Sequence, residues 1–128
     1  MTHIQTIIID RVGPSLNKWY GGAHWSKRSG TKKRWRLLVL AAVHEAGTRT
    51  VQHYPVRLSV TCVFGKGLRS FDCTNVAATA KLVEDGLVAC GVLRGDTPAY
   101  VRPVVLDSIK DSKRPTQTII QIEEKIPL

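Results

Sequence analysis

The chain has 128 residues, a formal net charge of +9 and an apolar content of 43%. We expect residues 1–128 to form a single domain, because this length supports one core but not two. No apolar run approaches the ~20 residues that a membrane span needs, and the N-terminus lacks the basic flank of a signal peptide. We therefore expect a cytoplasmic protein with no membrane partner.

The first part of the chain predicts a strand, a long loop and a helix. Residues 4–10 are rich in β-branched side chains and precede a Gly-Pro pair, which is typical of a strand. Residues 14–30 carry several glycines and no clear period, which predicts a long loop. Thr31 then caps a helix that ends at Gly47. The buried face of this helix is expected to hold Trp35, Leu38, Val39 and Ala42.

The middle of the chain predicts a strand, a basic loop and a second helix. Residues 56–64 alternate between apolar and polar, so they form a half-buried strand, and residues 65–71 form a loop. Asp72 or Thr74 caps the helix that follows, and Gly91 and Gly95 end it before Asp96. The core-facing stripe of this helix is expected to hold Val76, Ala80, Val83 and Leu87.

The last part of the chain predicts a β-hairpin. Residues 100–109 and 116–123 are rich in β-branched side chains, and a polar turn joins them. Pro103 indicates that its strand lies at a sheet edge or contains a bulge. Taken together, the elements predict an α/β or α+β two-layer domain with two helices packed on one face of a small mixed sheet. The odd, widely spaced cysteines favour reduced thiols, mostly buried, over a zinc site or disulfides.

Basic and aromatic residues are concentrated in one segment. No acid lies between Asp10 and Glu45. Basic side chains neutralise phosphates and aromatic rings stack on exposed bases, so this segment predicts a nucleic-acid surface. The residues assigned to it are Lys18, Trp19, His24, Trp25, Lys27, Arg28, Lys32, Lys33 and Arg36, with Lys66 and Arg69 from the later basic loop. The alternative is a solvated basic face with the tryptophans, Trp35 above all, in the core.

Two acids flank the second helix. In a strongly basic protein, the pair Asp72 and Asp96 suggests a divalent metal that faces a phosphate, with Thr74 as a further oxygen ligand. Lys81 is expected to stabilise negative charge on the phosphate during phosphodiester hydrolysis. The alternatives are a helix cap for Asp72, a loop turn for Asp96 and a solvated helix lysine for Lys81. Glu84 and Asp85 are expected to be mainly surface acids.

The stretch from residue 72 to residue 96 resembles the core motif of the RusA-like Holliday-junction resolvases. The shared features are D-x-T-N at 72–75, then Lys81, D-G-L at 85–87 and the loop A-C-G-V-L-R-G-D at 89–96. The family pattern is D-x-D-N, a helix with Lys and D-x-L, and a G-x-x-x-D-D loop. The segments P-S-L-N-K-W-Y and W-x-K-R before a W-R helix are also similar to the phage branch, so the resemblance covers roughly residues 12–101.

The resemblance implies a homodimeric endodeoxyribonuclease that binds four-way DNA junctions and resolves them by paired nicks. It implies Mg²⁺ as the metal, for which Mn²⁺ can substitute, and no small-molecule cofactor. Asp72, Asp96 and Lys81 match the catalytic residues of the family. Asn75 and Asp85 match supporting positions.

Two positions depart from the family pattern. Thr74 stands where the family has a second catalytic aspartate, and Gly95 replaces the first acid of the loop pair. A hydroxyl is a weaker, neutral ligand, so the sequence leaves two other functions open. One is a catalytically silent junction-binding protein of the same fold. The other is a basic RNA-binding protein, in which the acids are structural.

Overall fold

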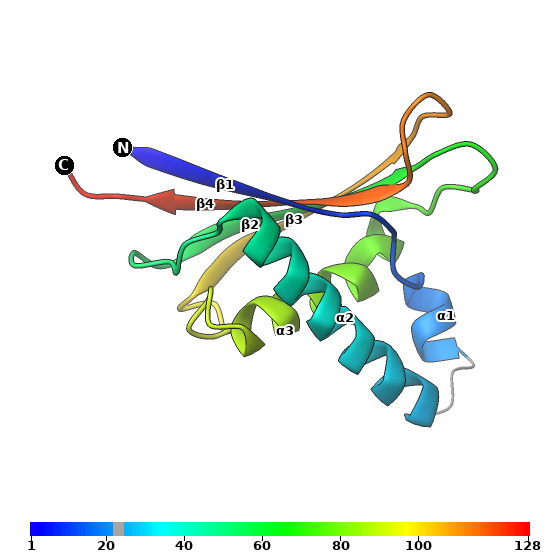
Figure 1. The fold of residues 1–128 in the computed structure, drawn as a ribbon, viewed down its shortest axis with the longest axis horizontal. Coiled ribbons are helices and arrows are strands. Elements are labelled where there is room, and N and C mark those ends of the chain that lie inside the picture. The colour runs from blue at the N-terminus through cyan, green and yellow to red at the C-terminus, as the bar shows by residue number, and fades with distance from the viewer. Residues whose placement is uncertain (22–24) are drawn as a thin grey trace.

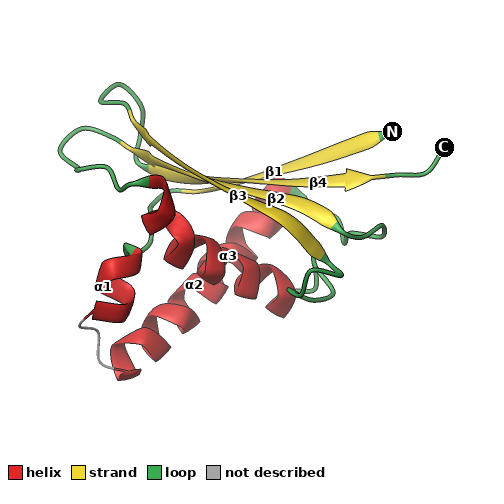
Figure 2. Ribbon diagram, turned by 180° about the vertical axis from the view of Figure 1, so that it is seen from behind, coloured by secondary structure: helices red, strands yellow, loops and turns green. Residues whose placement is uncertain are grey.

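Four strands and the helices that cover them form two layers. The computed structural model describes residues 1–21 and 25–128. Its elements are β1 (Thr2–Ile9), α1 (Leu16–Gly21), α2 (Trp25–Ala46), β2 (Val56–Phe64), the 3₁₀ helix η1 (Cys73–Val76), α3 (Ala77–Ala89), β3 (Val101–Lys110) and β4 (Gln117–Lys125). The strands form one mixed sheet, and the helices lie on one side of it in both views (Figures 1 and 2). The predicted α+β two-layer architecture is therefore confirmed.

The predicted hairpin is wrong. The strand order is β1-β4-β2-β3, so β2 lies between β3 and β4. β3 runs parallel to β2, and β4 runs antiparallel to both β2 and β1. The chain crosses the end of β2 on its way to β4, and the Asp111 N–H donates to the Phe64 carbonyl at 3.0 Å.

β3 is an edge strand, as Pro103 predicted. It pairs with β2 on one side only, and the register shifts between Val56 and Leu58, close to the proline. A proline cannot donate to a neighbouring strand, so an edge position with an irregular register suits it. Among residues 1–21 and 25–128, one long side of β3 therefore has no strand partner.

The segment 14–30 is not a continuous loop. It holds α1 and the first residues of α2, and α2 extends through Thr31. Thr31 is therefore not the N-cap. Its hydroxyl donates to the Lys27 carbonyl one turn earlier at 2.9 Å. The sequence did not predict the first turns of α2 because no apolar period marks residues 26–34. Within residues 1–21 and 25–128, no helix is long and apolar enough to cross a bilayer.

The core lies between the sheet and the two longer helices. α2 buries Trp35, Val39 and Ala42, as predicted, and Gly47 ends it in the left-handed conformation with φ of 65°. α3 packs against α2, and together with η1 it buries the predicted stripe of Val76, Ala80, Val83 and Leu87. The helix-facing side chains of the two central strands complete the core: Val56, Leu58, Val60, Cys62, Phe64, Ile120 and Ile122. All three cysteines are free, but only Cys62 is buried; Cys73 is exposed.

Gly86 sets the distance between α2 and α3. A Cβ at this position would lie 2.8 Å from Val39 Cβ and Cγ2. We expect Gly86→Ala to lower the free energy of unfolding by about 1–3 kcal/mol, because the helices must move apart. Gly30→Ala is the matched control: it has open space around it within α2, and should raise stability by about 0.5–1 kcal/mol. Urea unfolding measures both. Equal effects of the two substitutions would contradict the close helix contact.

Candidate functional site

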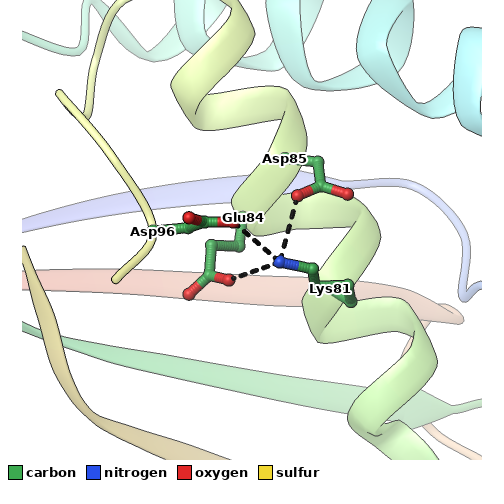
Figure 3. A network of polar contacts seen from close by, with 4 residues as sticks. All are labelled: Lys81, Glu84, Asp85 and Asp96. Carbon is green, nitrogen blue, oxygen red and sulfur yellow. Dashed lines mark hydrogen bonds and ion pairs between the residues drawn. The ribbon is translucent and has the colours of Figure 1, made fainter. Parts of the chain in front are cut away.

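Lys81 lies at the centre of a cluster of carboxylates on α3 and the loop that follows it. Its Nζ is 2.8 Å from Asp96 Oδ2, 3.3 Å from Asp85 Oδ1 and 3.4 Å from Glu84 Oε1 (Figure 3). Glu84 and Asp85 are three and four residues further along the same helix, which puts them next to Lys81. Asp96 reaches the cluster from the loop. The structure thus brings together Lys81, Asp85 and Asp96 among the predicted site residues.

The cluster fixes the charge of its members. The hydrogen bond to Asp96 raises the pKa of Lys81 well above its ordinary value, and the neighbouring Asp85 and Glu84 add to this effect. The same hydrogen bond lowers the pKa of Asp96. At neutral pH the lysine is therefore an ammonium group and the aspartate a carboxylate.

Glu84 is not the surface acid that the sequence predicted. It is 8% exposed, and burial raises the pKa of its carboxyl above the ordinary 4.5, against the opposing effect of Lys81. The signal that could have identified it is its position three residues after Lys81, next to the buried Val83.

Glu84→Gln is expected to raise the melting temperature at neutral pH. Because the carboxyl pKa is higher in the folded chain, the folded state binds more protons, and wild-type stability falls as the pH rises from about 4.5 through the folded pKa. The gain from the variant should therefore be small at pH 4 and full at neutral pH. Thermal melts in EDTA across this range measure it, with exposed Glu45→Gln as control. A gain that is the same at every pH would refute the burial argument.

Two tyrosines hold the loop that carries Asp96. The Arg94 N–H donates to the Tyr54 hydroxyl at 2.9 Å, and the Arg94 guanidinium lies 5.4 Å from the centre of the Tyr54 ring. The rings of Tyr54 and Tyr100 meet edge to face at 5.2 Å. The loop closes with hydrogen bonds from the Tyr100 and Val101 N–H groups to the Thr97 carbonyl. These contacts position Asp96 next to α3.

Tyr100 also explains why position 95 is a glycine. A Cβ on Gly95 would lie 2.6 Å from Tyr100 Cδ2. An aspartate, the residue that the resembling family has here, cannot fit unless the tyrosine ring moves. Glycine at position 95 therefore allows the Tyr100 ring to pack against this loop.

Asp72 lies at the opposite end of the helical segment. It occupies the N-cap position of η1, but its side chain makes no capping hydrogen bond, and its carbonyl accepts from the Asn75 N–H at 2.9 Å. Asp72 and Thr74 are both exposed, and the N-cap of α3 is Val76. The predicted side-chain cap is therefore wrong for both residues, and their oxygens remain available.

The loop before Asp72 is tied to β3. Lys110 Nζ donates to the carbonyls of Gly65 and Leu68 at 2.5 and 2.6 Å, and the Ser108 hydroxyl donates to the Phe71 carbonyl at 2.6 Å. The preceding residue of β3, Asp107, accepts a weak hydrogen bond from the Cys73 thiol at 3.9 Å. The end of β3 thus lies beside Asp72, whereas the start of β3 follows the Asp96 loop.

Asp72 and the Asp96 loop lie toward opposite ends of the helical segment. Lys81 is nine positions after Asp72 along this helical backbone, which corresponds to about 14 Å. Lys81 reaches further along the helix, toward Glu84 and Asp85, to meet Asp96. In the part of the chain described here, no three His, Cys, Asp or Glu side chains are grouped so that they could hold a metal. The predicted ligand set of Asp72, Thr74 and Asp96 contains only two side chains of these types, so it stays a prediction.

No family model and no curated protein matches the chain.

The predicted nucleic-acid residues fall into three groups. Most of the basic ones are exposed on α1, on α2 and on the loop between β2 and η1: Lys18, Lys27, Lys32, Lys33, Arg36, Lys66 and Arg69, with Arg28 half-buried. Trp19 is only 8% exposed and packs in the core, so its predicted role as a stacking platform is wrong. The side chains of His24 and Trp25 lie outside the described residues. Arg11 and Arg34, which belong to the same acid-free basic segment, line a cavity with several of these residues.

Proposed function

We propose that this protein is a structure-selective endodeoxyribonuclease that binds four-way DNA junctions and resolves them by paired nicks. We further propose that it acts as a homodimer with Mg²⁺ as its metal. The observation that carries the proposal is the contact of 2.8 Å between Lys81 Nζ and Asp96 Oδ2. These residues are 15 positions apart, and both match catalytic positions of the RusA-like motif. Their meeting at one place supports a shared role.

The charge of the pair suits phosphodiester hydrolysis. The reaction builds negative charge on the phosphate oxygens and on the leaving oxygen, and fixed positive charge stabilises both. Lys81 keeps its proton because Asp96 raises its pKa, so it acts as an electrostatic stabiliser and not as a general base. Asp96 stays ionised and holds the ammonium group in place.

The basic surface supports a nucleic acid as the partner. Lys32, Lys33 and Arg36 are exposed on α2, and Lys66 and Arg69 are exposed on the loop that leads to Asp72. Such side chains neutralise phosphates and release counterions. The Lys81 cluster, in contrast, carries three carboxylates around one ammonium group (Figure 3). A polyanion is therefore attracted to one part of the surface and repelled at another.

A twofold-related second copy offers a way to bring Asp72 and Asp96 together. The start of β3 adjoins the Asp96 loop, and its end adjoins Asp72. If a twofold-related copy packs along the free side of β3, the two β3 strands run antiparallel, and the Asp96 end of each subunit lies beside the Asp72 end of its partner. The proposed ligand set is then assembled twice, once for each of two equivalent junction strands.

A groove next to β3 favours this mode of packing. It has a volume of about 170 Å³ and is lined by Ala77, Ala80, Lys81 and Glu84 of α3 and by Val104 and Leu106 of β3. Val104 is 44% exposed at the free edge of the sheet. Apolar side chains at an unpaired sheet edge favour contact with another protein surface, here the same edge of a second copy.

The test uses a labelled synthetic four-way junction beside a linear duplex of the same sequence. Purified protein is incubated with each DNA in Mg²⁺, in Mn²⁺ and in EDTA. The proposal requires symmetric, metal-dependent nicks in the junction and little cleavage of the duplex. Equal binding to any nucleic acid without cleavage would support the basic RNA-binding alternative instead.

The second candidate is a junction-binding protein that has lost cleavage. Tyr100 fills the space of an acid at position 95, and Thr74 supplies a hydroxyl in place of a carboxylate. Both features lower the negative charge available to a cation. Tight, junction-selective binding in EDTA with no nicks in either metal would favour this candidate.

A further inference from the structure

A cavity whose charged lining residues are all basic lies between α1, α2 and the turn that follows β1. It has a volume of about 370 Å³, within the range of roughly 300–1,000 Å³ of pockets that take small molecules or parts of larger ones. Its charged lining comes from three separate segments and is basic throughout: Arg11 from the turn, Lys18 from α1, and Lys27, Arg28 and Arg34 from α2. Among the described residues, no acid lines it.

The charges of this cavity are almost uncompensated. Of the five basic residues that line the cavity, only Arg11 has an ion pair with a residue outside the range 21–26. Its partner is Asp10 at 3.1 Å, and both side chains are largely exposed. An exposed pair of this kind contributes little. Like charges that converge in a cleft repel one another, and walls of low dielectric strengthen their field. A bound anion would remove this repulsion.

The wall of the cavity is rigid and closed to bases. Trp19 and Trp35 line it but are only 8% and 3% exposed, so they offer little ring surface for stacking. Gly13 packs so closely on the core that a Cβ there would lie 2.7 Å from Thr79 Oγ1. At the start of α1, the Lys18 N–H donates to the Ser15 hydroxyl at 3.1 Å. The turn after β1 and the start of α1, which carry Arg11 and Lys18, are therefore packed beside the cavity.

We propose that this cavity is a phosphate-binding site. Guanidinium groups match the oxygens of a phosphate in pairs, and the lysines add point charges. In the nucleic-acid complex it holds one backbone phosphate of the bound strand, a step that rests on the proposed function. α1 packs against η1 and α3, so a strand anchored in the cavity lies at the end of the subunit that carries Asp72.

The first test uses inorganic phosphate and the tryptophan fluorescence of the full chain at constant ionic strength. We expect saturable binding by the wild type, weakened about tenfold or more in Arg34→Gln. Arg36→Gln is the matched control, because Arg36 lies two residues further along α2 and does not line the cavity. Both arginines are exposed, so both variants should fold, which circular dichroism checks. Binding that does not saturate, or that is equal in the two variants, overturns the inference.

The second test separates a strand phosphate from a free one. Binding of an oligonucleotide duplex is measured in EDTA against salt concentration. Arg34→Gln should reduce the slope of log K against log salt by about one, and phosphate ion should no longer compete with the DNA. If Arg34→Gln loses phosphate binding but phosphate ion still competes with the DNA as in the wild type, the site takes free phosphate and not the strand. This binding test is done without metal, so its result does not depend on cleavage. A protein that passes it but does not cleave junctions in Mg²⁺ or Mn²⁺ would contradict the proposed function and leave the phosphate site intact.

Discussion

Asp96→Asn is expected to lower the rate of junction cleavage by at least about 10³-fold. The variant loses the charge that pairs with Lys81 Nζ at 2.8 Å, so the ammonium group is no longer held in place, and it loses a carboxylate that the proposed metal site needs. Junction binding in EDTA should change by less than about threefold, since the basic surface is untouched. Single-turnover cleavage and gel-shift assays measure the two quantities.

The control for this variant is Glu45→Gln. Glu45 is an exposed acid at the end of α2, away from the Lys81 cluster, and its loss changes the net charge by the same amount. Its cleavage rate should stay near that of the wild type. Normal cleavage by Asp96→Asn would rule out the assignment of this aspartate to the site.

Mixed dimers of Asp72→Asn and Asp96→Asn are expected to regain cleavage that neither variant has alone. If each site takes Asp72 from one subunit and Asp96 from the other, a mixed dimer has one site with both acids and one site with neither. Equal co-refolding makes about half of the dimers mixed, so about a quarter of the wild-type sites should be restored. The products should be single nicks, because the second site of each mixed dimer is inactive.

Metal binding gives a second readout that does not depend on turnover. Mn²⁺ titrations followed by electron paramagnetic resonance should show bound metal in the mixed sample and little in either parent variant. The contrary result is a mixture that stays inactive and binds no metal while the wild type cleaves. Each site then takes Asp72 and Asp96 from the same subunit, and the proposed packing along β3 is wrong. An inactive wild type would instead argue against the nuclease itself.

The sequence predicted the elements with a strong period. Residues 56–64 alternate regularly because β2 has one face on the core, and the α3 stripe is apolar because it is buried in the core. The hairpin failed for a different reason. Residues 111–116 have the polar composition of a tight turn, but composition does not show that the chain crosses β2 before it pairs again. Strand order depends on which faces pack together, which is a tertiary property.

The site was predicted as a set of residues and not as an arrangement. The motif identified Lys81 and Asp96, and the helical spacing of Lys81 and Asp85 made their contact foreseeable. Nothing in the spacing showed that Tyr100 occupies the space beside Gly95, or that Glu84 is buried. The cavity around Arg34 was also beyond the sequence, because its lining residues come from a turn and two helices whose packing brings them together.

The carboxylate cluster around Lys81 forms a negative region on a protein that is otherwise strongly positive. Its formal charge is −2, in a protein whose total is +9. If the protein binds DNA as proposed, a duplex on the cationic helices would be repelled when its backbone comes within about a Debye length, ~10 Å at 0.1 M salt, of these acids. Millimolar divalent cations should therefore tighten the complex, although an equal ionic strength of sodium chloride weakens it. If the protein binds DNA as proposed, this change of sign would limit how far a duplex moves along the surface.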